Sequence, residues 1–523
     1  MVDKIVISNN SALNNKYGTQ GLQAVQAGIA KLVAADLARG LQTTYVAVDD
    51  PTDMSTAGGV AVTNPQDPQQ NKLAVDALYG FHKPQYLVLL GSLDVIPHQI
   101  LTNPAYNPDP VNGDPDQTVP SDLPYACDGP FSQNISDFDG PERVVSRLPD
   151  ITGTNDPAYL IHVLDIATNA TTLTHSDYAD YLGVSAAVWS QSTASSLNAI
   201  FGLSADMQSV PPASYQWPAS LLSRRSHYFN CHGADLTPQY FGQIGTSYPV
   251  AHDASYVTGR LTSGTVASAE CCYGAQLYDP VANPVPNQQM GIANVYMAGG
   301  AYGFWGSTTI AYGPADSNAQ ADLICQYFLE RVLNGASLGE AALSARQTYV
   351  QNMSTVGPVD QKTLAQYILL GDASIHCVPS ADPGVKAAPR FARVGITTEE
   401  VERLSRLWRR QRLAQSGSML RATRAVAESS PSEPPQKIRA KLEQVRAAAG
   451  LQNPAYASYR VRPAPEPTVF GAKALTPQAG FPTAFHLLFE GRAITQLRIK
   501  ALRIVEVTEA DGEFIRVREF FSR

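Results

Sequence analysis

Two short segments carry the residue types that could perform nucleophilic catalysis. Residues 264–269, a run of small and β-branched side chains, lead to Cys271 and a nearby glycine turn. Residues 226–230 lead in the same way to His232 and Gly233. A thiol and an imidazole are the nucleophile and the base of cysteine-dependent acyl transfer. We therefore interpret the protein as a cysteine peptidase.

Both segments are predicted to be buried strands that end in a glycine turn. In open α/β sheets, catalytic groups lie at the carboxyl ends of the strands. Two neighbouring strands would therefore bring the thiol and the imidazole to one cleft. The Cys-x-x-Gly turn after Cys271 would point backbone N–H groups into this cleft, where they can stabilise a tetrahedral oxyanion. Gly233 would leave room for a peptide beside the base.

These residues also have less specific interpretations. A free cysteine is often a small buried hydrophobic residue, and a single histidine is often part of a core or a loop. A zinc ion could be bound by Cys231, His232, Cys271 and Cys272. However, zinc ligands usually occur as C-x₂₋₄-C pairs, and adjacent cysteines point to opposite faces of a strand. We therefore expect neither a metal nor another cofactor.

The chain of 523 residues is long enough for two or three domains. Its 44% hydrophobic and 16% charged residues indicate a globular protein that is slightly poor in charge. No apolar run reaches the roughly 18 residues of a transmembrane helix, and the first residues lack the layout of a signal peptide. The six cysteines form no C-x-x-C pair, so we expect free thiols in a reducing compartment, with the cytoplasm as the location.

Charge is divided unevenly along the chain. Residues 1–380 contain 14 Lys and Arg against 32 Asp and Glu, whereas residues 381–523 contain 24 against 14. This division predicts two modules, and it favours a basic module that docks on the acidic one or on a partner protein. A basic face that is only solvated is the simplest alternative, and we do not expect nucleic acid as the partner.

Hydrophobic periodicity predicts the fold class of residues 1–380. Strands alternate with amphipathic helices, and some strands are unbroken apolar runs typical of a buried parallel sheet. We predict a doubly wound, mostly parallel α/β sheet flanked by helices. It has an N-terminal part, 1–150, and a part with the His and Cys motifs, 151–380. Strands are expected at 4–7, 43–48, 86–91, 143–149, 181–188, 226–230, 264–269 and 367–372, and helices at 18–40, 73–79, 319–333 and 337–351.

Residues 381–523 are predicted to form a smaller, basic α+β module. It should contain two helices, a Pro-rich linker and a small antiparallel sheet. An Asp-Gly dipeptide marks one turn of this sheet. In sequence order these are the helices at 397–426 and 436–449, the linker at 453–482, and three strands from residue 484, with the turn at 511–512.

Over about residues 1–380, the chain resembles the gingipain-type cysteine peptidases of the caspase-like superfamily. The resemblance is based on seven short motifs that occur in the order of the family. Three of them depart from the family pattern, with Ser146 and Cys231 in place of glycine and Ala373 in place of proline. The motifs are residues 87–97 (an apolar strand, a glycine and an Ile-Pro exit), 121–125 (Ser-Asp-x-x-Tyr), 142–147 (Glu-x-x-x-Gly-Arg), 231–233 (Gly-His-Gly), 271–274 (Cys-x-x-Gly), 306–308 (Gly-Ser-Thr) and 370–374 (Leu-Gly-Asp-Pro-Ser).

The resemblance implies a caspase-like fold and roles for individual residues. His232 would be the general base and acid and Cys271 the nucleophile, with the amides of Gly233 and Cys271 as the oxyanion hole. Glu142 occupies the position of an acid that orients the histidine, although a solvated carboxylate at a strand end has the same appearance. Cys272 is the rival nucleophile, because the caspase branch spaces its motif as Cys-x-Gly. We prefer Cys271 because of its Cys-x-x-Gly spacing.

The residue whose carbonyl group is attacked, called P1, is harder to predict. By resemblance, a gingipain-like pocket uses a carboxylate to hold Arg or Lys, whereas a caspase pocket uses arginines to hold Asp. Asp235 and Asp279 lie near the site motifs in the sequence and favour a basic P1 residue. Trp305 is a candidate pocket wall, although an aromatic residue in such a segment is more often part of the core.

Together these patterns predict a cysteine endopeptidase that hydrolyses protein or peptide substrates through a Cys-His dyad and a thioester acyl-enzyme. Regulation or self-processing through the C-terminal module is part of this prediction. The alternative is a catalytically inactive caspase-like scaffold that binds a partner protein. The presence of both reactive residues favours the enzyme.

Overall fold

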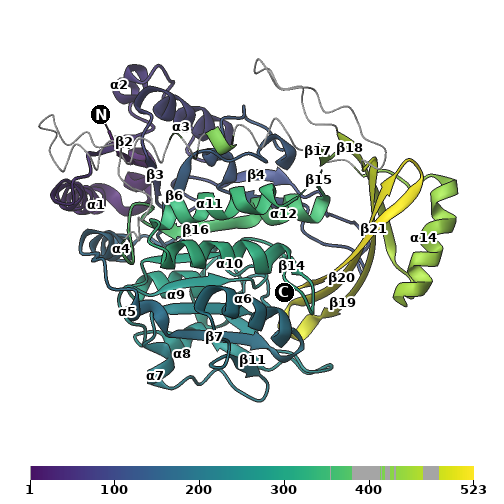
Figure 1. Cartoon of the computed structure of the whole chain (residues 1–523). Coiled ribbons are helices and arrows are strands. Elements are labelled where there is room, and N and C mark those ends of the chain that lie inside the picture. Colours follow the sequence, from purple (N-terminus) through teal and green to yellow (C-terminus); the bar gives the residue numbers. More distant parts are fainter. Residues whose placement is uncertain are drawn as a thin grey trace, which may run out of the picture.

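The strands of the α/β part assemble into one large central sheet (Figure 1). The computed structural model describes residues 2–353, 355–379, 411, 413, 415–417, 425–428, 431–462 and 482–523. In spatial order, the described strands of this sheet are β2 (Thr43–Ala47), β1 (Lys4–Ser8), β3 (Tyr86–Leu90), β6 (Val144–Leu148), β16 (Tyr367–Gly371), β13 (Gly303–Ser307), β12 (Val266–Ala269), β9 (Ser226–Asn230), β7 (Tyr181–Ala186) and β8 (Gln208–Val210).

Most neighbouring strands of the central sheet run parallel. The pairs β1–β2, β1–β3, β3–β6, β7–β8, β7–β9, β9–β12 and β12–β13 are parallel, whereas β13 and β16 are antiparallel. The central strands are buried throughout, as the unbroken apolar run of β3 indicates. The predicted doubly wound, mostly parallel α/β sheet is therefore confirmed.

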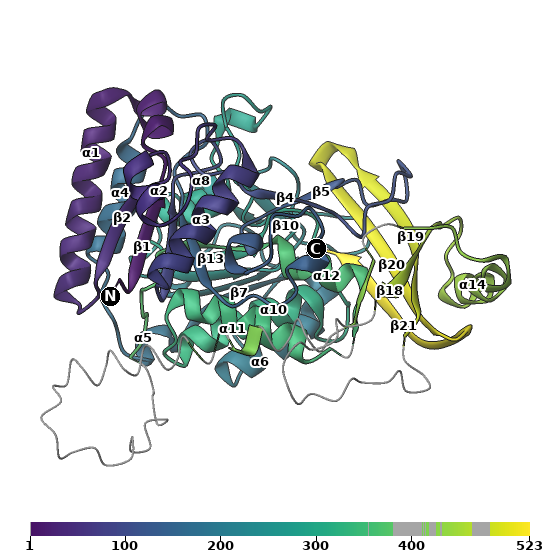
Figure 2. The ribbon, with the colours of Figure 1, turned by 90° about the horizontal axis from the view of Figure 1, so that it is seen from above.

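Helices cover both faces of this sheet (Figure 2). Helix α1 illustrates the amphipathic pattern, because Val25, Ile29 and Leu32 are buried at helical spacing. It begins earlier than predicted, since Asn9 caps it and a kink at Gly18 joins two helical segments. The longer helices are α1 (Asn10–Ala38), α3 (Pro68–His82), α4 (Ala158–Thr168), α6 (Ser190–Phe201), α9 (Ile292–Ala298), α10 (Gln320–Leu333), α11 (Leu338–Gln351) and α12 (Pro358–Gln366).

Shorter elements connect the main strands and helices. Two of them are hairpins that lie outside the central sheet, β4–β5 and β10–β11. The short elements are α2 (Pro51–Thr56), β4 (Gln99–Thr102), β5 (Thr118–Ser121), α5 (Ser176–Ala179), α7 (Ala219–Leu222), β10 (Gln239–Phe241), β11 (Val250–Asp253) and α8 (Ala254–Val257).

The C-terminal residues build most of a second, mostly antiparallel sheet beside the α/β part (Figure 1). The predicted meander is confirmed, with its turn at Asp511 and Gly512, both at positive φ. Helix α14 (Gln436–Ala449) covers this sheet with Ile438 and Leu442. In spatial order the described strands are β14 (Tyr312–Gly313), β21 (Glu513–Ser522), β20 (Ile499–Ala510), β19 (Ala484–Ile494), β18 (Ala455–Arg462), β17 (Ala425–Ala427) and β15 (Thr355–Val356).

Two parts of the C-terminal prediction differ from the structure. The expected linker at 453–482 begins with β18, which pairs with β19 along six residues, so tertiary pairing outweighs its irregular composition. The expected helix at 397–426 ends in a strand, β17, and most of its length lies outside the described residues. The predicted domain boundary between residues 380 and 381 also lies outside them.

Two strands of the second sheet come from the α/β part of the chain. β14 pairs with the end of β21, and β15 pairs with β17. Arg518 of β21 supports this junction from a largely buried position, because it donates to Asp360 of α12 at 2.7 Å and to Glu506 at 2.5 Å. The C-terminal strands are therefore joined to the α/β part by backbone pairing as well as by side chains. In the described part of the chain, no helix is both long and apolar enough to cross a bilayer.

Candidate active site

The imidazole of His232 lies directly after β9, inside the protein. Its backbone forms a two-way bridge with Phe241, at 2.8 Å in each direction. The ring lies against two aromatic side chains, with centroid distances of 4.4 Å to Trp189 and 5.2 Å to Tyr248. Only 2% of the residue is exposed. Strand β9 and these rings therefore fix the position of the imidazole.

Gln243 fixes which ring nitrogen can act as the base. Its Oε1 lies 2.7 Å from His232 Nε2. Its own amide nitrogen donates to the Gly245 carbonyl at 3.0 Å and to the Tyr248 hydroxyl at 3.2 Å, so the amide oxygen must face the ring. Nε2 then carries the proton, and Nδ1, which has no hydrogen-bond partner, is free to accept one. Burial lowers the pKa of His232 to about 4, so the ring is neutral at pH 7.

We expect Gln243→Leu to reduce peptide hydrolysis about 10- to 100-fold, because a base that loses its orienting partner is less often aligned. The pKa of His232 should fall further without this hydrogen bond, so the acid limb of kcat/KM moves to lower pH. Gln243→Glu should move it to higher pH, because a carboxylate stabilises the imidazolium. The pH profiles of both variants test this assignment, with thermal melting as the control for folding. Unchanged profiles would contradict it.

The two adjacent cysteines point in different directions. The thiol of Cys271 lies in the core, 4.0 Å from the carbonyl oxygen of Phe229. Burial and the neighbouring Cys231 thiol raise the pKa of Cys271 well above its ordinary value. The sulfur of Cys272 instead accepts the N–H of Ala311 at 3.3 Å, beside β14. Adjacent residues at a strand end project to opposite sides, and here the pair faces two different environments.

The backbone of Gly233 lies directly against that of Cys272. A Cβ atom at position 233 would lie 1.7 Å from the carbonyl oxygen of Cys272, so only glycine allows this approach. The N–H groups of Gly233 and Cys272 both donate to the main-chain oxygen of Arg523, at 3.3 and 3.2 Å. Two amides that converge on one carbonyl oxygen have the geometry of an oxyanion hole. Gly233 thus lies where the sequence placed it, but its partner amide is that of Cys272 and not that of Cys271.

The structure does not bring Glu142 to the histidine. Glu142 precedes β6, which is separated from β9 by β16, β13 and β12. It lines a small hollow together with Gln85, which precedes β3, and Glu340 of α11. Its Oε1 lies 4.0 Å from Arg143. Among the described residues, Gln243 and not Glu142 holds the imidazole.

The three residues predicted to bind the substrate lie elsewhere. Trp305 is fully buried on β13, where its ring stacks on Phe328, so it belongs to the core. Asp279 accepts backbone N–H groups of the turn that follows it. Asp235 accepts a hydrogen bond from Gln276 at 2.7 Å. None of these three residues lines the pocket beside His232.

Two of the motifs that carry the family resemblance meet in a buried ion pair. Asp122 of the Ser-Asp-x-x-Tyr loop accepts from Arg147 at 2.6 Å and lies 2.8 Å from the ring of His98. Burial alone would raise the pKa of Asp122, but Arg147 and His98 outweigh this effect and hold it below its ordinary value. This ion pair therefore holds the long loop after β3 against β6, the strand that contains Arg147.

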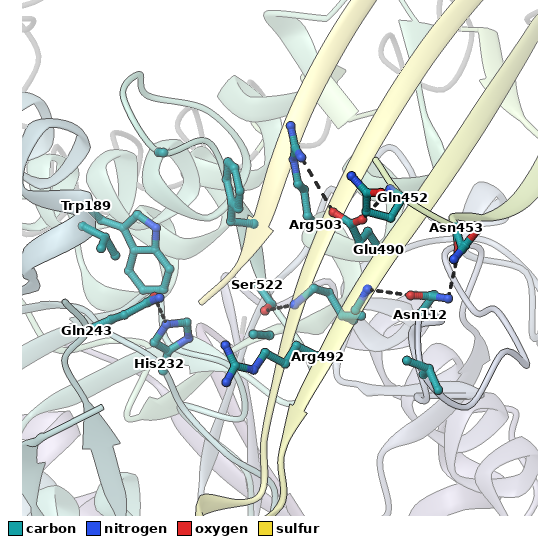
Figure 3. Close-up of a pocket in the computed structure, with 17 residues that line it drawn as sticks. Asn112, Trp189, His232, Gln243, Gln452, Asn453, Glu490, Arg492, Arg503 and Ser522 are labelled. Atoms are coloured by element: carbon teal, nitrogen blue, oxygen red, sulfur yellow. Dashed lines mark hydrogen bonds and ion pairs between the residues drawn. The ribbon is translucent and has the colours of Figure 1, made fainter. Parts of the chain in front are cut away.

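A pocket of about 720 Å³ lies beside the imidazole (Figure 3). His232, Gln243 and Trp189 line it from the α/β part. The opposite wall is formed by β19 and β20, with Arg492 and Arg503 among its residues. Phe521 and Ser522 at the end of β21 also line this pocket, whereas Cys272, which is 3% exposed, does not. Among the described residues, no group of His, Cys, Asp and Glu is arranged to hold a metal ion.

A comparison with known protein families matches part of this chain. Residues 233–378 match Peptidase family C25. The matched segment begins directly after His232 and contains Cys271 and Cys272, so the expected resemblance to gingipain-type peptidases is confirmed. The match to family C25 supports a cysteine peptidase, a hydrolase that acts on proteins or peptides.

No curated protein matches the chain. A solved structure titled "Structure of Protease" is 14% identical, with a TM-score of 0.44, over 99% of this chain and 96% of that one.

Sequence patterns missed two kinds of residue at the candidate site. Gln243 follows β10 in a segment without a motif, and only the fold brings it to His232. Asp322 on α10 and Glu270 before the cysteines are fully buried carboxylates near the oxyanion hole. The sequence does contain a signal for Asp322, because this carboxylate falls on the apolar face of an amphipathic helix. A buried carboxylate needs a charged or hydrogen-bonding partner, so the pattern indicates a polar site there.

Proposed function

We propose that the protein is a cysteine endopeptidase in which Cys272 is the nucleophile and His232 is the general base and acid. The observation that supports this most is the convergence of the Gly233 and Cys272 amides on one main-chain oxygen, at 3.3 and 3.2 Å. A carbonyl group held by the amide of Cys272 lies next to the side chain of that same residue. The Cys271 thiol, in contrast, faces the core.

The proposed reaction uses groups whose positions the structure defines. Nδ1 of His232 takes the proton of the Cys272 thiol, and the sulfur attacks the carbonyl carbon of the substrate. The amides of Gly233 and Cys272 stabilise the negative oxygen of the tetrahedral intermediate. Collapse breaks the C–N bond, the amine takes the proton from His232, and a thioester remains. Water activated by His232 then hydrolyses the thioester and regenerates the thiol.

The pocket beside His232 suits the part of the substrate that leaves first. The imidazole of His232 lines this pocket, and the departing amine must receive its proton from that imidazole. Burial raises the pKa of the Cys272 thiol, so the thiolate is not the resting form when the site is closed. The thiolate would form only when a substrate and the base are aligned.

Labelling with a peptidyl electrophile that alkylates thiols tests this function. We expect a single alkylated cysteine, Cys272, identified by peptide mapping. The change His232→Ala should slow the reaction about 100-fold or more, because the base is lost. His162→Ala, at an exposed position of α4, is the matched control and should leave the rate unchanged. Alkylation of no cysteine in the unchanged chain or in any variant, together with a peptide library left intact, would contradict the proposal and favour a scaffold. The low exposure of both Cys272 and His232 is the observation that favours that alternative.

A further inference from the structure

The residue whose oxygen fills the oxyanion hole places its side chain in a closed pocket. Arg523 is fully buried. Its Nη2 donates to both carboxylate oxygens of Asp322, at 3.0 and 2.9 Å, and to the carbonyl oxygen of Pro314 at 2.6 Å. Its Nε lies 3.8 Å from Glu270, and its guanidinium lies 4.5 Å from the ring centroid of Trp189. The pocket therefore matches the charge of a guanidinium, whose hydrogen bonds are made by Nη2, while Nε and Nη1 have no hydrogen-bond partner among the described residues.

The main chain that leads to Arg523 is bound as an added strand. Phe521 and Ser522 pair antiparallel with β14. The N–H of Arg523 donates to the carbonyl oxygen of Ala311 at 2.9 Å. Main-chain pairing with an exposed strand, combined with a pocket for one side chain, is a common way for a protein to bind an extended peptide.

Both features meet at the proposed nucleophile. The N–H of Cys272 binds the main-chain oxygen of Arg523, and its sulfur accepts the N–H of Ala311, the residue that receives the N–H of Arg523. The main-chain oxygen of Arg523 therefore lies where the carbonyl oxygen of a P1 residue would bind in the proposed oxyanion hole.

We propose that residues 520–523 occupy the substrate cleft of their own chain, with Arg523 as a P1 mimic held by Asp322 and Glu270, and that this segment must leave before a peptide with Arg at P1 can bind. The proposal deepens the proposed peptidase function and rests on it. The closed conformation is then an inhibited one, because the cleft, the oxyanion hole and the thiol are all covered.

The two carboxylates explain why the pocket selects a cation. Asp322 and Glu270 are both fully buried. Burial and the neighbouring Asp322 raise the pKa of Glu270 well above its ordinary value, whereas Arg523 lowers it. A buried pair of carboxylates without a cation is unfavourable, so an empty pocket should favour either proton uptake or a positively charged P1 side chain.

Arg518 of β21 is a useful comparison with Arg523, because its role is structural. It also binds two carboxylates, those of Asp360 and Glu506. These partners lie on α12 and β20, and its interactions involve no amide of the oxyanion hole. Arg523 combines carboxylate binding with a main-chain oxygen at Gly233 and Cys272, which an anchoring role alone does not require.

The full chain and its Arg523→Ala variant test the proposal. We expect Arg523→Ala to raise the rate of Cys272 alkylation by a peptidyl electrophile with Arg at P1 by about tenfold or more, because the competing side chain is removed. An electrophile with Ala at P1 should react much more slowly with the same variant. Arg516→Ala, an exposed arginine of β21, is the matched control and should react like the unchanged chain.

A binding measurement covers the case in which Arg523→Ala destabilises the sheet. A synthetic peptide with the sequence of residues 519–523 should bind an Arg523→Ala, Cys272→Ala variant in calorimetry and protect β14 from hydrogen exchange. The same peptide with Ala at its last position should bind at least about tenfold more weakly. Asp322→Asn added to the variant should remove this difference between the two peptides.

The outcomes separate this proposal from the function on which it rests. Two results together would overturn the role of residues 520–523 as a P1 mimic. These are equal alkylation rates in the unchanged chain and in Arg523→Ala, and equal binding of the peptides that end in Arg or Ala. The proposed peptidase function would not be affected. Alkylation of no cysteine in any variant would overturn the peptidase. Binding that depends on Arg and Asp322 would still support the cleft as an arginine-binding site in that case.

Discussion

Replacing Cys272 by alanine should abolish peptide hydrolysis, with a loss of about 10⁴-fold or more in kcat, whereas replacing Cys271 should not. The reason is geometric, since the amide of Cys272 binds the carbonyl oxygen at the reacting centre and its sulfur lies beside β14. Removal of a covalent nucleophile costs about this much, because only binding and the oxyanion hole remain. Steady-state kinetics of both variants on one peptide with Arg at P1 measure the difference, best in the Arg523→Ala background.

Cys271→Ala is the matched control for this prediction. Its thiol packs in the core beside Phe229 and Cys231, so the variant should lose about 1 kcal/mol of unfolding free energy through lost packing and keep most of its activity. A Cys271→Ala protein that melts normally but is inactive, next to an active Cys272→Ala protein, would reverse the assignment. It would restore the nucleophile that the Cys-x-x-Gly spacing favours.

Gly233→Ala should reduce kcat about 10²- to 10³-fold, the cost of losing one donor of an oxyanion hole. A Cβ atom at this position would lie 1.7 Å from the carbonyl oxygen of Cys272, and backbone cannot yield as a flexible side chain does. The two strand ends must therefore separate, and the two amides no longer converge. KM should change less than kcat, because the oxyanion hole acts mainly in the transition state.

Gly80→Ala provides the control for this substitution. Gly80 lies within α3 with nothing within 4 Å of its would-be Cβ atom, so alanine there should be neutral or slightly stabilising. A Gly233→Ala enzyme with normal kcat would show that the amides of Gly233 and Cys272 do not form the oxyanion hole. Thermal melts of both variants separate a local effect at the site from a general loss of stability.

The fold followed from the sequence wherever local patterns and tertiary burial agree. The apolar run of β3 and the spacing of Val25, Ile29 and Leu32 in α1 identify buried elements without further information. β13 escaped prediction because its glycines hide a strand pattern. Gly306 is needed there, since a Cβ atom would lie 3.1 Å from the backbone nitrogen of Ala275.

Only those residues of the site that lie within a sequence motif could be predicted. His232 and Gly233 carry a local signature, and the structure places them at the end of β9 as expected. The choice between Cys271 and Cys272 depends on the exact register of a strand end, and a shift of one residue exchanges the two faces. Gln243 and Asp322 bind partners that only tertiary folding brings near. The Arg523–Asp322 contact, for example, joins residues 201 positions apart.

The two-residue strands at the borders of the second sheet have a consequence for association. β14 and β15 pair with β21 and β17, so part of each outer edge of the C-terminal strands is occupied. The part of β21 that precedes these paired residues carries charged side chains such as Arg516 and Glu519. Such charges disfavour pairing with other chains. If residues 520–523 left the cleft, the backbone groups of β14 that pair with Phe521 and Ser522 would lose their partners. The unpaired strand edge would then be available for pairing between molecules. At high concentration, we expect residues 520–523 of a second molecule to pair with it.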